Sequence, residues 1–212
     1  MVAKLRKFDN QQCAVIALNS GAVVVAAQIA ITLHANLMVL MSEDIVLPGE
    51  HDPLAAMTTS TFTYNQSLSS GQVDEYVNEY HGLIDEQRVA KFRKLNSLLS
   101  NGGEIDPKFL RHHVVILVSD ALQTGISLQV AADFLKPIKL KRLVIATPLA
   151  SIKAVDRMHL LADEIYCLSV GENLMESDHY YEDNTVPDWA GVQKIIRNIS
   201  MTWDLSGATS KR

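Results

Sequence analysis

The sequence predicts a doubly wound α/β fold with a mainly parallel, five-stranded sheet and a small flap. Five short apolar runs have the length and continuity of strands that are buried on both faces. Helical patterns separate most of these runs, and strands that alternate with helices form a parallel sheet covered by helices on both sides. The 212 residues, 48% of them hydrophobic, are enough for a single domain over 1–212.

The opening of the chain has a strand-helix-strand pattern. The stretch "CAVIAL" (13–18) is short and apolar throughout, which predicts a buried strand over 14–18. The run 22–34 is rich in small apolar residues and is long enough for a buried helix. "NLMVLM" (36–41) predicts the second strand.

An insertion interrupts the alternation after this unit. Residues 42–52 are expected to be a loop, whereas 55–65 is rich in Thr and aromatic residues, which favour an exposed or edge strand. We therefore expect 42–72 to form a hood over the sheet. The charged stretch 73–99 has apolar residues near helical spacing and predicts a long helix, which ends before Asn-Gly-Gly.

The second half of the chain returns to the alternation. Three further strands are predicted, at 113–118, 142–147 and 164–168. The helices predicted between and after them are 124–136, 151–162 and 187–199. Ser151 is a candidate N-cap, because a serine hydroxyl accepts from the unpaired amides of a first helical turn. A polar tail occupies 171–212.

Composition excludes several classes of protein. The net charge of -5 argues against a broad nucleic acid interface. The longest apolar stretch, "AVVVAAQIAI", is about half of what a membrane span needs, and the first ten residues lack the apolar core of a signal peptide. We therefore expect a cytoplasmic protein without nucleic acid or membrane partners.

Small polar residues gather where the third strong strand turns into a helix, in "VSDALQTGIS" (118–127). In an open parallel sheet, ligands bind beyond the carboxyl ends of the strands, and the first amides of a helix attract anions. Gly125 would let the backbone approach an anion, Thr124 and Ser127 would add hydroxyl donors, and Asp120 could accept from sugar hydroxyls or hold a metal ion. A side chain at 125 would then push the anion away, and would also strain the turn if Gly125 has a positive φ. The alternative is that Thr124 only caps the helix and Gly125 only makes a tight turn.

The stretch "VVILVSDALQTGISLQVAADFLK" resembles the signature of type I phosphoribosyltransferases. The resemblance extends to "AVIALNSGAVVVAAQIAITLHANLMVLM", similar to the first βαβ unit of that family, and to "RLVIATPLASIKAVDRMHLLADEIYCLSV", similar to its later strand-helix-strand unit. "YYEDNTVPD" looks like a tail segment of one bacterial and archaeal branch of predicted members. The resemblance covers most of the chain, and 42–110 matches in layout more than in residues.

The resemblance implies a site for phosphoribosyl pyrophosphate (PRPP) and, with it, Mg²⁺. Asp120 would contact the ribose hydroxyls, act in catalysis and bind the metal, while Asn19, Ser20 and Gly21 would face the pyrophosphate. The residues implied around the 5-phosphate are Ala121, Leu122, Gln123, Thr124, Gly125 and Ser127.

Three positions depart from the family pattern. Ser119 stands where the first of two acids is usual, and Asn19 stands where this branch carries Arg. Gln123 replaces an acid of the purine-type members. Each lost electrostatic contact commonly costs about 10²–10³ in rate, so the site is better suited to binding phosphate than to turnover.

Three functions therefore remain open. The chain is a phosphoribosyltransferase that transfers the phosphoribosyl group of PRPP to a nitrogenous base, or a non-catalytic module that binds PRPP or a nucleotide for regulation or with a partner. An unrelated α/β binding domain that shares only the phosphate turn is the third alternative. A homodimer is also expected, because family members commonly dimerise and the helix 73–99 carries Tyr76, Tyr80, Leu83 and Phe92.

Overall fold

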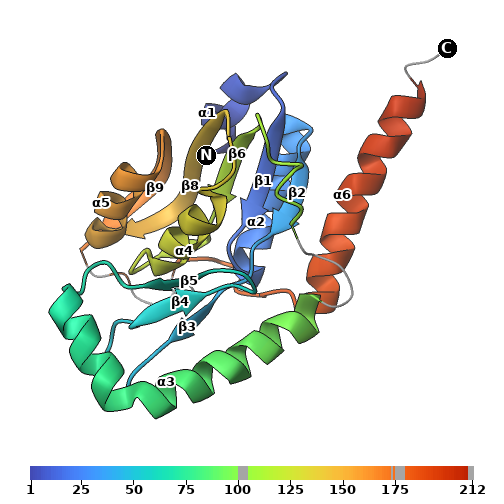
Figure 1. Ribbon diagram of the computed structural model, residues 1–212. Helices are drawn as coiled ribbons and strands as arrows, with labels where there is room; N and C mark the ends of the chain where they lie inside the picture. The colour runs from blue at the N-terminus through green and yellow to red at the C-terminus, as the bar shows by residue number, and fades with distance from the viewer. Residues whose placement is uncertain (100–104, 173, 175–179, 210–212) are drawn as a thin grey trace.

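A computed structural model describes residues 1–99, 105–172, 174 and 180–209, with side chains up to residue 200. Its centre is a parallel sheet of order β2-β1-β6-β8-β7, with β9 paired to β8 (Figure 1). The five predicted strands are present: β1 Cys13–Ala17, β2 Asn36–Val39, β6 Val114–Val118, β8 Arg142–Ser151 and β9 Glu164–Gly171. The sixth, β7 Ala121–Leu122, was not predicted, and β8 and β9 extend beyond the predicted ends.

The strands that position the site end level with one another. Ala17 of β1 pairs with Val39 of β2 and with Val118 of β6, and Val118 pairs with Ala146 of β8. The segments that follow β1 and β6 therefore leave the sheet side by side at its carboxyl edge.

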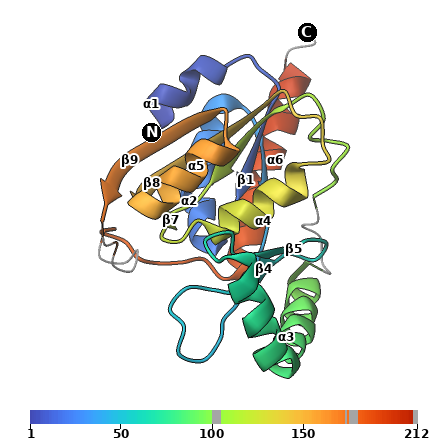
Figure 2. The same ribbon diagram turned by 60° about the vertical axis from the view of Figure 1, so that its left-hand side comes forward.

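Helices cover both faces of this sheet, as the alternation predicts (Figure 2). One face carries Val15 and Val118 and packs against α2 Ser20–Leu33, together with α1 Val2–Leu5 and α6 Trp189–Thr209. The opposite face carries Ile16 and Leu117 and packs against α4 Ile126–Leu135 and α5 Ile152–Leu161. Each fully buried Val, Leu or Ile contributes about 1.5–3 kcal/mol, so these two clusters stabilise the fold.

The hood is a separate antiparallel sheet of order β3-β4-β5. Its strands are β3 Glu43–Ile45, β4 Ala55–Met57 and β5 Phe62–Tyr64. The expectation of a loop over 42–52 was wrong at β3, because Glu43–Ile45 pairs with Ala55–Met57 across the intervening turn. Only Ile45 of these three β3 residues is fully buried, so the segment has no apolar run that would predict a strand.

The long helix α3 Ser70–Leu99 covers the hood rather than the central sheet (Figure 1). Non-helical dihedral angles at Tyr80 kink it, and Tyr76 and Tyr80 pack against the core of the hood. Val89 and Phe92 stay 51% and 44% exposed. Two of the aromatic residues expected at a dimer interface therefore contribute to the hood core instead.

The tail passes below the carboxyl edge of the sheet and leads into α6, which packs against α2 (Figure 1). The predicted start at 187 is two residues early, and Asp188 Oδ1 accepts from Gly191 N at 2.8 Å in the first turn. Within the described ranges, no helix is both long enough and apolar enough to cross a membrane.

Candidate functional site

The segment between β6 and α4 is held in place by the neighbouring strand and helix. Its first two residues after Asp120 form β7, which pairs with Leu149 and Ala150 at the end of β8. The Ser151 hydroxyl then donates to the carbonyl of Gln123 and accepts from Ala154 N at 3.0 Å, so it also caps α5 as predicted. The loop is thereby fixed to two elements that belong to the rigid core.

The turn into α4 leaves amides open at the helix start. Gly125 is the N-cap residue, with left-handed dihedral angles (φ 70°, ψ 12°), and it has no side chain with which to cap the helix. Thr124 Oγ1 lies 3.5 Å from Ile126 N, at the limit of a hydrogen bond, and the amides of Ser127 and Leu128 have no acceptor among the described residues. Such amides carry partial positive charge and bind anions. Thr124 thus accepts one long hydrogen bond at the helix start, and the choice between a cap and a phosphate ligand stays a prediction.

These groups border a cavity of ≈390 Å³ at the carboxyl edge. Its lining consists of Asn19, Asp44, Asp120 and residues 121–127. Among the described residues, this lining contains two carboxylates and no Lys or Arg. Burial raises the pKa of Asp44, and the nearby Lys91 opposes that rise. An anion here would depend on backbone amides and hydroxyls, with Asp44 acting against it whenever its carboxyl is ionised.

Gly125 has the positive φ that would strain any other residue, as expected, and it also lies close to α5. A Cβ at this position would point toward α5, 3.1 Å from Arg157 Cδ and 3.5 Å from Ala154 Cα. The expectation that a side chain at 125 would push the anion away is therefore wrong, because the side chain would leave on the α5 side. The positive φ and the close approach of α5 are what select glycine.

Arg157 connects this turn to the hood. Its Nη2 donates to Asn65 Oδ1 at 2.6 Å and to the hydroxyl of Ser67. Burial lowers the pKa of the guanidinium, and the charge of Asp52 opposes that change. The phosphate turn, α5 and the hood are thus joined through one side chain.

Asp120 and the turn after β1 meet at the carboxyl edge, as the resemblance implies. Asp120 Oδ1 accepts from Asn19 Nδ2 at 3.0 Å and from Ala121 N at 2.9 Å. Asn19 Oδ1 accepts from Ala22 N at 2.7 Å and so caps α2. Asp120 Oδ2 lies over Gly21, where an added Cβ would be only 2.4 Å away. Gly21 is therefore needed for space, and Asn19 orients the carboxylate.

The other two predicted positions take different places. Ser119 is 2% exposed and does not line the cavity, and its hydroxyl donates to Ala121 O at 2.8 Å. Ser20 is the first residue of α2 and is also absent from the lining. Contact between either residue and a ligand stays a prediction.

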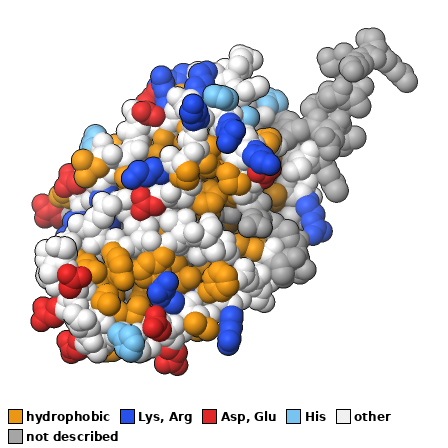
Figure 3. Space-filling model, in the orientation of Figure 1, with side chains coloured by type: hydrophobic (Ala, Val, Ile, Leu, Met, Phe, Trp, Pro, Cys, Tyr) orange, Lys and Arg blue, Asp and Glu red, His pale blue; other side chains and the backbone are white. Residues whose placement is uncertain are grey.

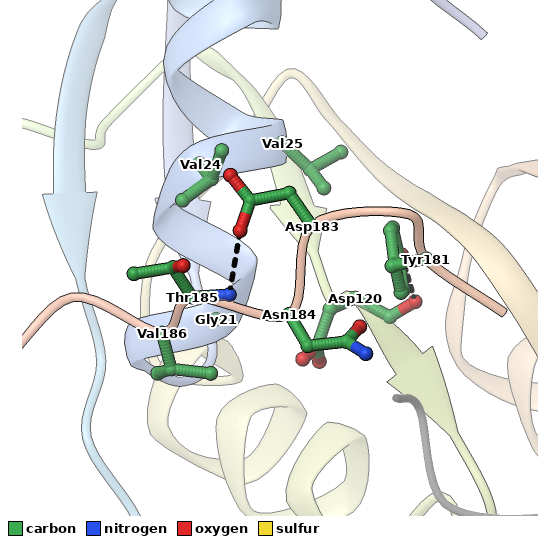
Figure 4. A pocket seen from close by; sticks show the side chains of 9 residues that line it. All are labelled: Gly21, Val24, Val25, Asp120, Tyr181, Asp183, Asn184, Thr185 and Val186. Carbon is green, nitrogen blue, oxygen red and sulfur yellow. Dashed lines mark hydrogen bonds between the residues drawn. The ribbon is translucent and has the colours of Figure 1, made fainter. Parts of the chain in front are cut away.

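A second cavity of ≈400 Å³ lies on the other side of Asp120, between α2 and the tail (Figure 4). Tyr181, which the sequence did not single out, closes one end and donates its hydroxyl to Asp120 O at 2.7 Å. Burial, together with the charge of Asp120, raises the pKa of Tyr181 to about 12. The phenol therefore remains a donor at neutral pH and holds the tail against the sheet edge.

The donor set at the edge is compatible with Mg²⁺. The described residues contain no group of three or more His, Cys, Asp or Glu side chains that could hold a metal ion. Protein-bound Mg²⁺ often uses only one or two carboxylates, with phosphate oxygens and water completing the octahedron. Asp120 Oδ2 accepts no hydrogen bond from the part of the chain that the structure describes, so it is available for this role.

The fold and the site define a class: a doubly wound α/β protein with a glycine turn and open helix amides at the carboxyl edge of its sheet. Within that class, the model of the phosphoribosyl transferase domain family matches residues 1–179. The chain belongs to this family, as the resemblance of its motifs predicted.

Solved structures share the fold. The chain is similar to the TT1426 protein from Thermus thermophilus, with 23% identity, 92% of each chain covered and a TM-score of 0.66. It also matches a purine phosphoribosyltransferase from Pyrococcus horikoshii, with 14% identity, coverage of 88% of this chain and 87% of that one, and a TM-score of 0.46. For the APRTase from Giardia lamblia complexed with 9-deazaadenine, identity is 12%, coverage 81% and 76%, and the TM-score 0.45.

Proposed function

We propose that the chain binds a 5-phosphorylated ribose, either PRPP or a nucleotide, with the phosphate at the start of α4. The observation that carries the proposal is the left-handed Gly125 at the start of α4, where the amides of Ser127 and Leu128 have no acceptor among the described residues and Ser127 lines the cavity. The family match over residues 1–179 supports a phosphorylated sugar as the ligand. Asp120 lines the same cavity and would accept from the ribose hydroxyls.

The charge pattern makes Mg²⁺ the expected companion of the ligand. The described lining of the phosphate cavity has two carboxylates and no basic side chain. When bound with PRPP, Mg²⁺ would neutralise phosphate charge and favour the departure of pyrophosphate. Asp120 would hold it through Oδ2, and Asn19 would keep that carboxylate oriented through the bond to Oδ1.

Transfer of the phosphoribosyl group to a nitrogenous base is the reaction that the family implies. In such a transfer the bond from ribose C1 to pyrophosphate breaks, a bond to a nitrogen of the base forms, and positive charge develops on the ribose ring. Asp120 would stabilise that charge. Asn19 is neutral and already donates to Asp120, so it offers no cationic donor to pyrophosphate.

That same observation favours a second candidate, a non-catalytic module that binds PRPP or a nucleotide. Asn19 caps α2 and orients Asp120, which are structural roles, and Ser119 is turned away from the cavity. A chain that retains the phosphate turn but lacks these charges would bind its ligand and react slowly.

Calorimetric titration tests the binding proposal. Ribose 5-phosphate and PRPP are added to the full chain with and without Mg²⁺, and release of pyrophosphate is followed with a panel of bases. Saturable binding of ribose 5-phosphate, with PRPP bound more tightly in Mg²⁺, is expected. If neither ligand binds in either condition, the proposal is wrong, and rapid release of pyrophosphate would reject the non-catalytic alternative.

A homodimer remains our proposal for the assembly. Hydrophobic side chains gather over the hood and α3 on the face shown in Figure 3. Val89 and Phe92 are exposed there and form a hollow with Met57, bordered by Arg88 and Asp85. Light scattering at tens of micromolar should give a dimer mass that falls to a monomer mass in Phe92→Asp. A monomer mass for the unaltered chain would contradict this proposal. The cytoplasmic location remains a prediction.

A further inference from the structure

A further hollow lies on the face of the sheet that α4 and α5 cover. It has a volume of ≈860 Å³ and is bordered by the C-terminal halves of these two helices and by residues 138–143, and we call it the α4–α5 hollow. Because α4 ends and β8 begins beside it, this hollow lies toward the amino edge of the sheet, whereas the phosphate turn is at the carboxyl edge. A ligand of the α4–α5 hollow is therefore independent of the phosphate site.

The α4–α5 hollow has a basic rim. Its described lining contains two carboxylates and four exposed cations, and these cations are Lys136, Lys139, Lys141 and Arg142. Figure 3 shows Lys and Arg side chains gathered in the upper half of the molecule, with hydrophobic side chains among them. The chain as a whole has a net charge of -5, so a positive surface is a local feature. Cations that lie close together repel one another, and they therefore attract an anionic partner.

Only part of this positive charge is used within the chain. One of the four cations pairs with Glu164, and another donates to Gln11 Oε1 at 2.9 Å. Lys136 and Lys139 form no ion pair or side-chain hydrogen bond with the part of the chain that the structure describes. The two carboxylates of the lining accept hydrogen bonds from a threonine hydroxyl and from a backbone amide. Two lysines at the rim are thus available to a partner.

Apolar side chains lie between these cations. Leu160 of α5 belongs to the lining and is 85% exposed, and the half-buried Leu143 and Leu161 continue the apolar surface. Removal of such a leucine from water is favourable, so a partner that covers it gains affinity. An apolar surface with a polar rim is typical of a protein interaction site. The described lining contains no Phe, Tyr or Trp that could stack on a base, which makes nucleic acid a poorer fit.

We propose that the α4–α5 hollow binds an acidic segment of a partner protein that also carries apolar side chains. Carboxylates of this segment would pair with Lys136 and Lys139, and its apolar side chains would cover Leu160. Charge complementarity therefore selects an acidic partner, and the exposed leucine selects an amphipathic one. An amphipathic helix in a hydrophobic groove is a common mode of recognition between proteins.

Fluorescence anisotropy with synthetic probes tests the proposal on the full chain. The first probe is a labelled peptide of Glu and Leu at helical spacing. The second has Lys in place of Glu, the third has Ser in place of Leu, and the fourth is a single-stranded oligodeoxythymidine. The Glu-Leu peptide should bind saturably, and its affinity should fall as salt is added. The Lys-Leu peptide should not bind, and the Glu-Ser peptide should bind about tenfold or more weakly than the Glu-Leu peptide.

Two variants of the exposed apolar positions of α5 locate the binding. Leu160→Asp removes the leucine from the α4–α5 hollow and adds a negative charge. Ile152→Asp is the matched control, because Ile152 is 48% exposed on the same helix and does not line this hollow. Leu160→Asp should weaken binding of the Glu-Leu peptide about tenfold or more, and Ile152→Asp should leave it unchanged.

A pair of charge reversals tests the rim. Lys136→Glu and Lys139→Glu are introduced together, and the control changes two exposed cations of α6, Lys194→Glu and Arg197→Glu. The net charge changes equally in both double variants, so only a local effect distinguishes them. The rim variant should lose about tenfold or more in affinity for the Glu-Leu peptide, and the α6 variant should lose much less.

Several results would overturn the proposal. The Glu-Leu peptide fails to bind, it binds no more tightly than the Lys-Leu peptide, or its binding survives both Leu160→Asp and the rim reversal. Tighter binding of the oligodeoxythymidine would assign the surface to nucleic acid instead. Light scattering on the chain alone is the last comparison: a mass that falls in Leu160→Asp but not in Ile152→Asp would identify a second copy of the chain as the occupant, which also contradicts the proposal.

Discussion

Replacing Gly125 by alanine should affect both stability and anion binding. Gly125 has φ 70° and ψ 12°, and an L-residue in this left-handed region costs roughly 1–2 kcal/mol. The new methyl group would lie 3.1 Å from Arg157 Cδ, which the long side chain can relieve, and 3.5 Å from Ala154 Cα, which is ordinary contact. Strain in the turn is therefore the main cost, and the melting temperature should fall by about 2–8 °C.

The same strain should weaken the phosphate site. Relaxation of Gly125 toward negative φ would turn the open amides at the start of α4 away from the cavity. Loss of one hydrogen bond to a charged group costs about 1.5–3 kcal/mol, which is about a 10- to 150-fold loss of affinity for ribose 5-phosphate. Scanning calorimetry and titration calorimetry on the same preparation measure both effects.

Gly49→Ala is the matched control. Gly49 also has a positive φ, of +82°, but it lies in an exposed hood turn with no atom within 4 Å of its added Cβ. This variant should lose about 1–2 kcal/mol of stability and keep its affinity for ribose 5-phosphate. If Gly125→Ala loses no more affinity than Gly49→Ala, the amides at α4 do not form the anion site and the reasoning is refuted.

Three further predictions concern the same site. Thr124→Ala should weaken ribose 5-phosphate binding by about 1–3 kcal/mol and change the melting temperature little, because the bond from Ile126 N to Thr124 Oγ1 is long, at 3.5 Å. A lower melting temperature with unchanged affinity would show that Thr124 is only a helix cap. The pKa of Asp44 is raised, so the carboxylate loses its charge as pH falls through that raised value. Sulfate does not titrate in this range and should therefore bind to the cavity more tightly at lower pH. Asp44→Asn should raise sulfate affinity at pH 7 and flatten this dependence, whereas the exposed Asp74→Asn on α3 should do neither. The double change Asn19→Arg and Ser119→Asp should increase the release of pyrophosphate from PRPP. It should also lower the melting temperature, because it removes the cap of α2 and buries a carboxylate. Unchanged release in a folded variant would show that these two charges do not limit turnover.

Apolar continuity predicted the central sheet well because its strands are buried on both faces. All residues of β1 and β6 are buried, so "CAVIAL" and "HVVILV" indicate strands without any knowledge of their neighbours. The hood was harder to predict. In β3 only Ile45 is fully buried, and the strand exists because β4 pairs with it.

The candidate site residues also fall into two groups: those that local patterns place and those that only the packing of distant segments places. Asn19, Asp120 and Gly125 follow the carboxyl ends of parallel strands. These ends meet at one edge of the sheet, so the proximity of the three residues could be expected. Tyr181 could not be placed, because its contact with Asp120 joins residues that are 61 positions apart through a tail with no strand or helix pattern of its own. The sequence likewise could not show that the Ser119 hydroxyl donates to Ala121 O.

The sequence alone determined the class of sheet, the position of the turn that we propose binds phosphate, and the family, because each depends on local runs of residues and on short-range motifs. Only the tertiary structure decided which way each side chain points and which segments meet. It directs a side chain at 125 toward Arg157 rather than into the cavity, and it leaves the described lining of the phosphate cavity without a cation. It also creates a second cavity where the tail crosses α2. These features arise from packing between distant segments, which local patterns do not encode.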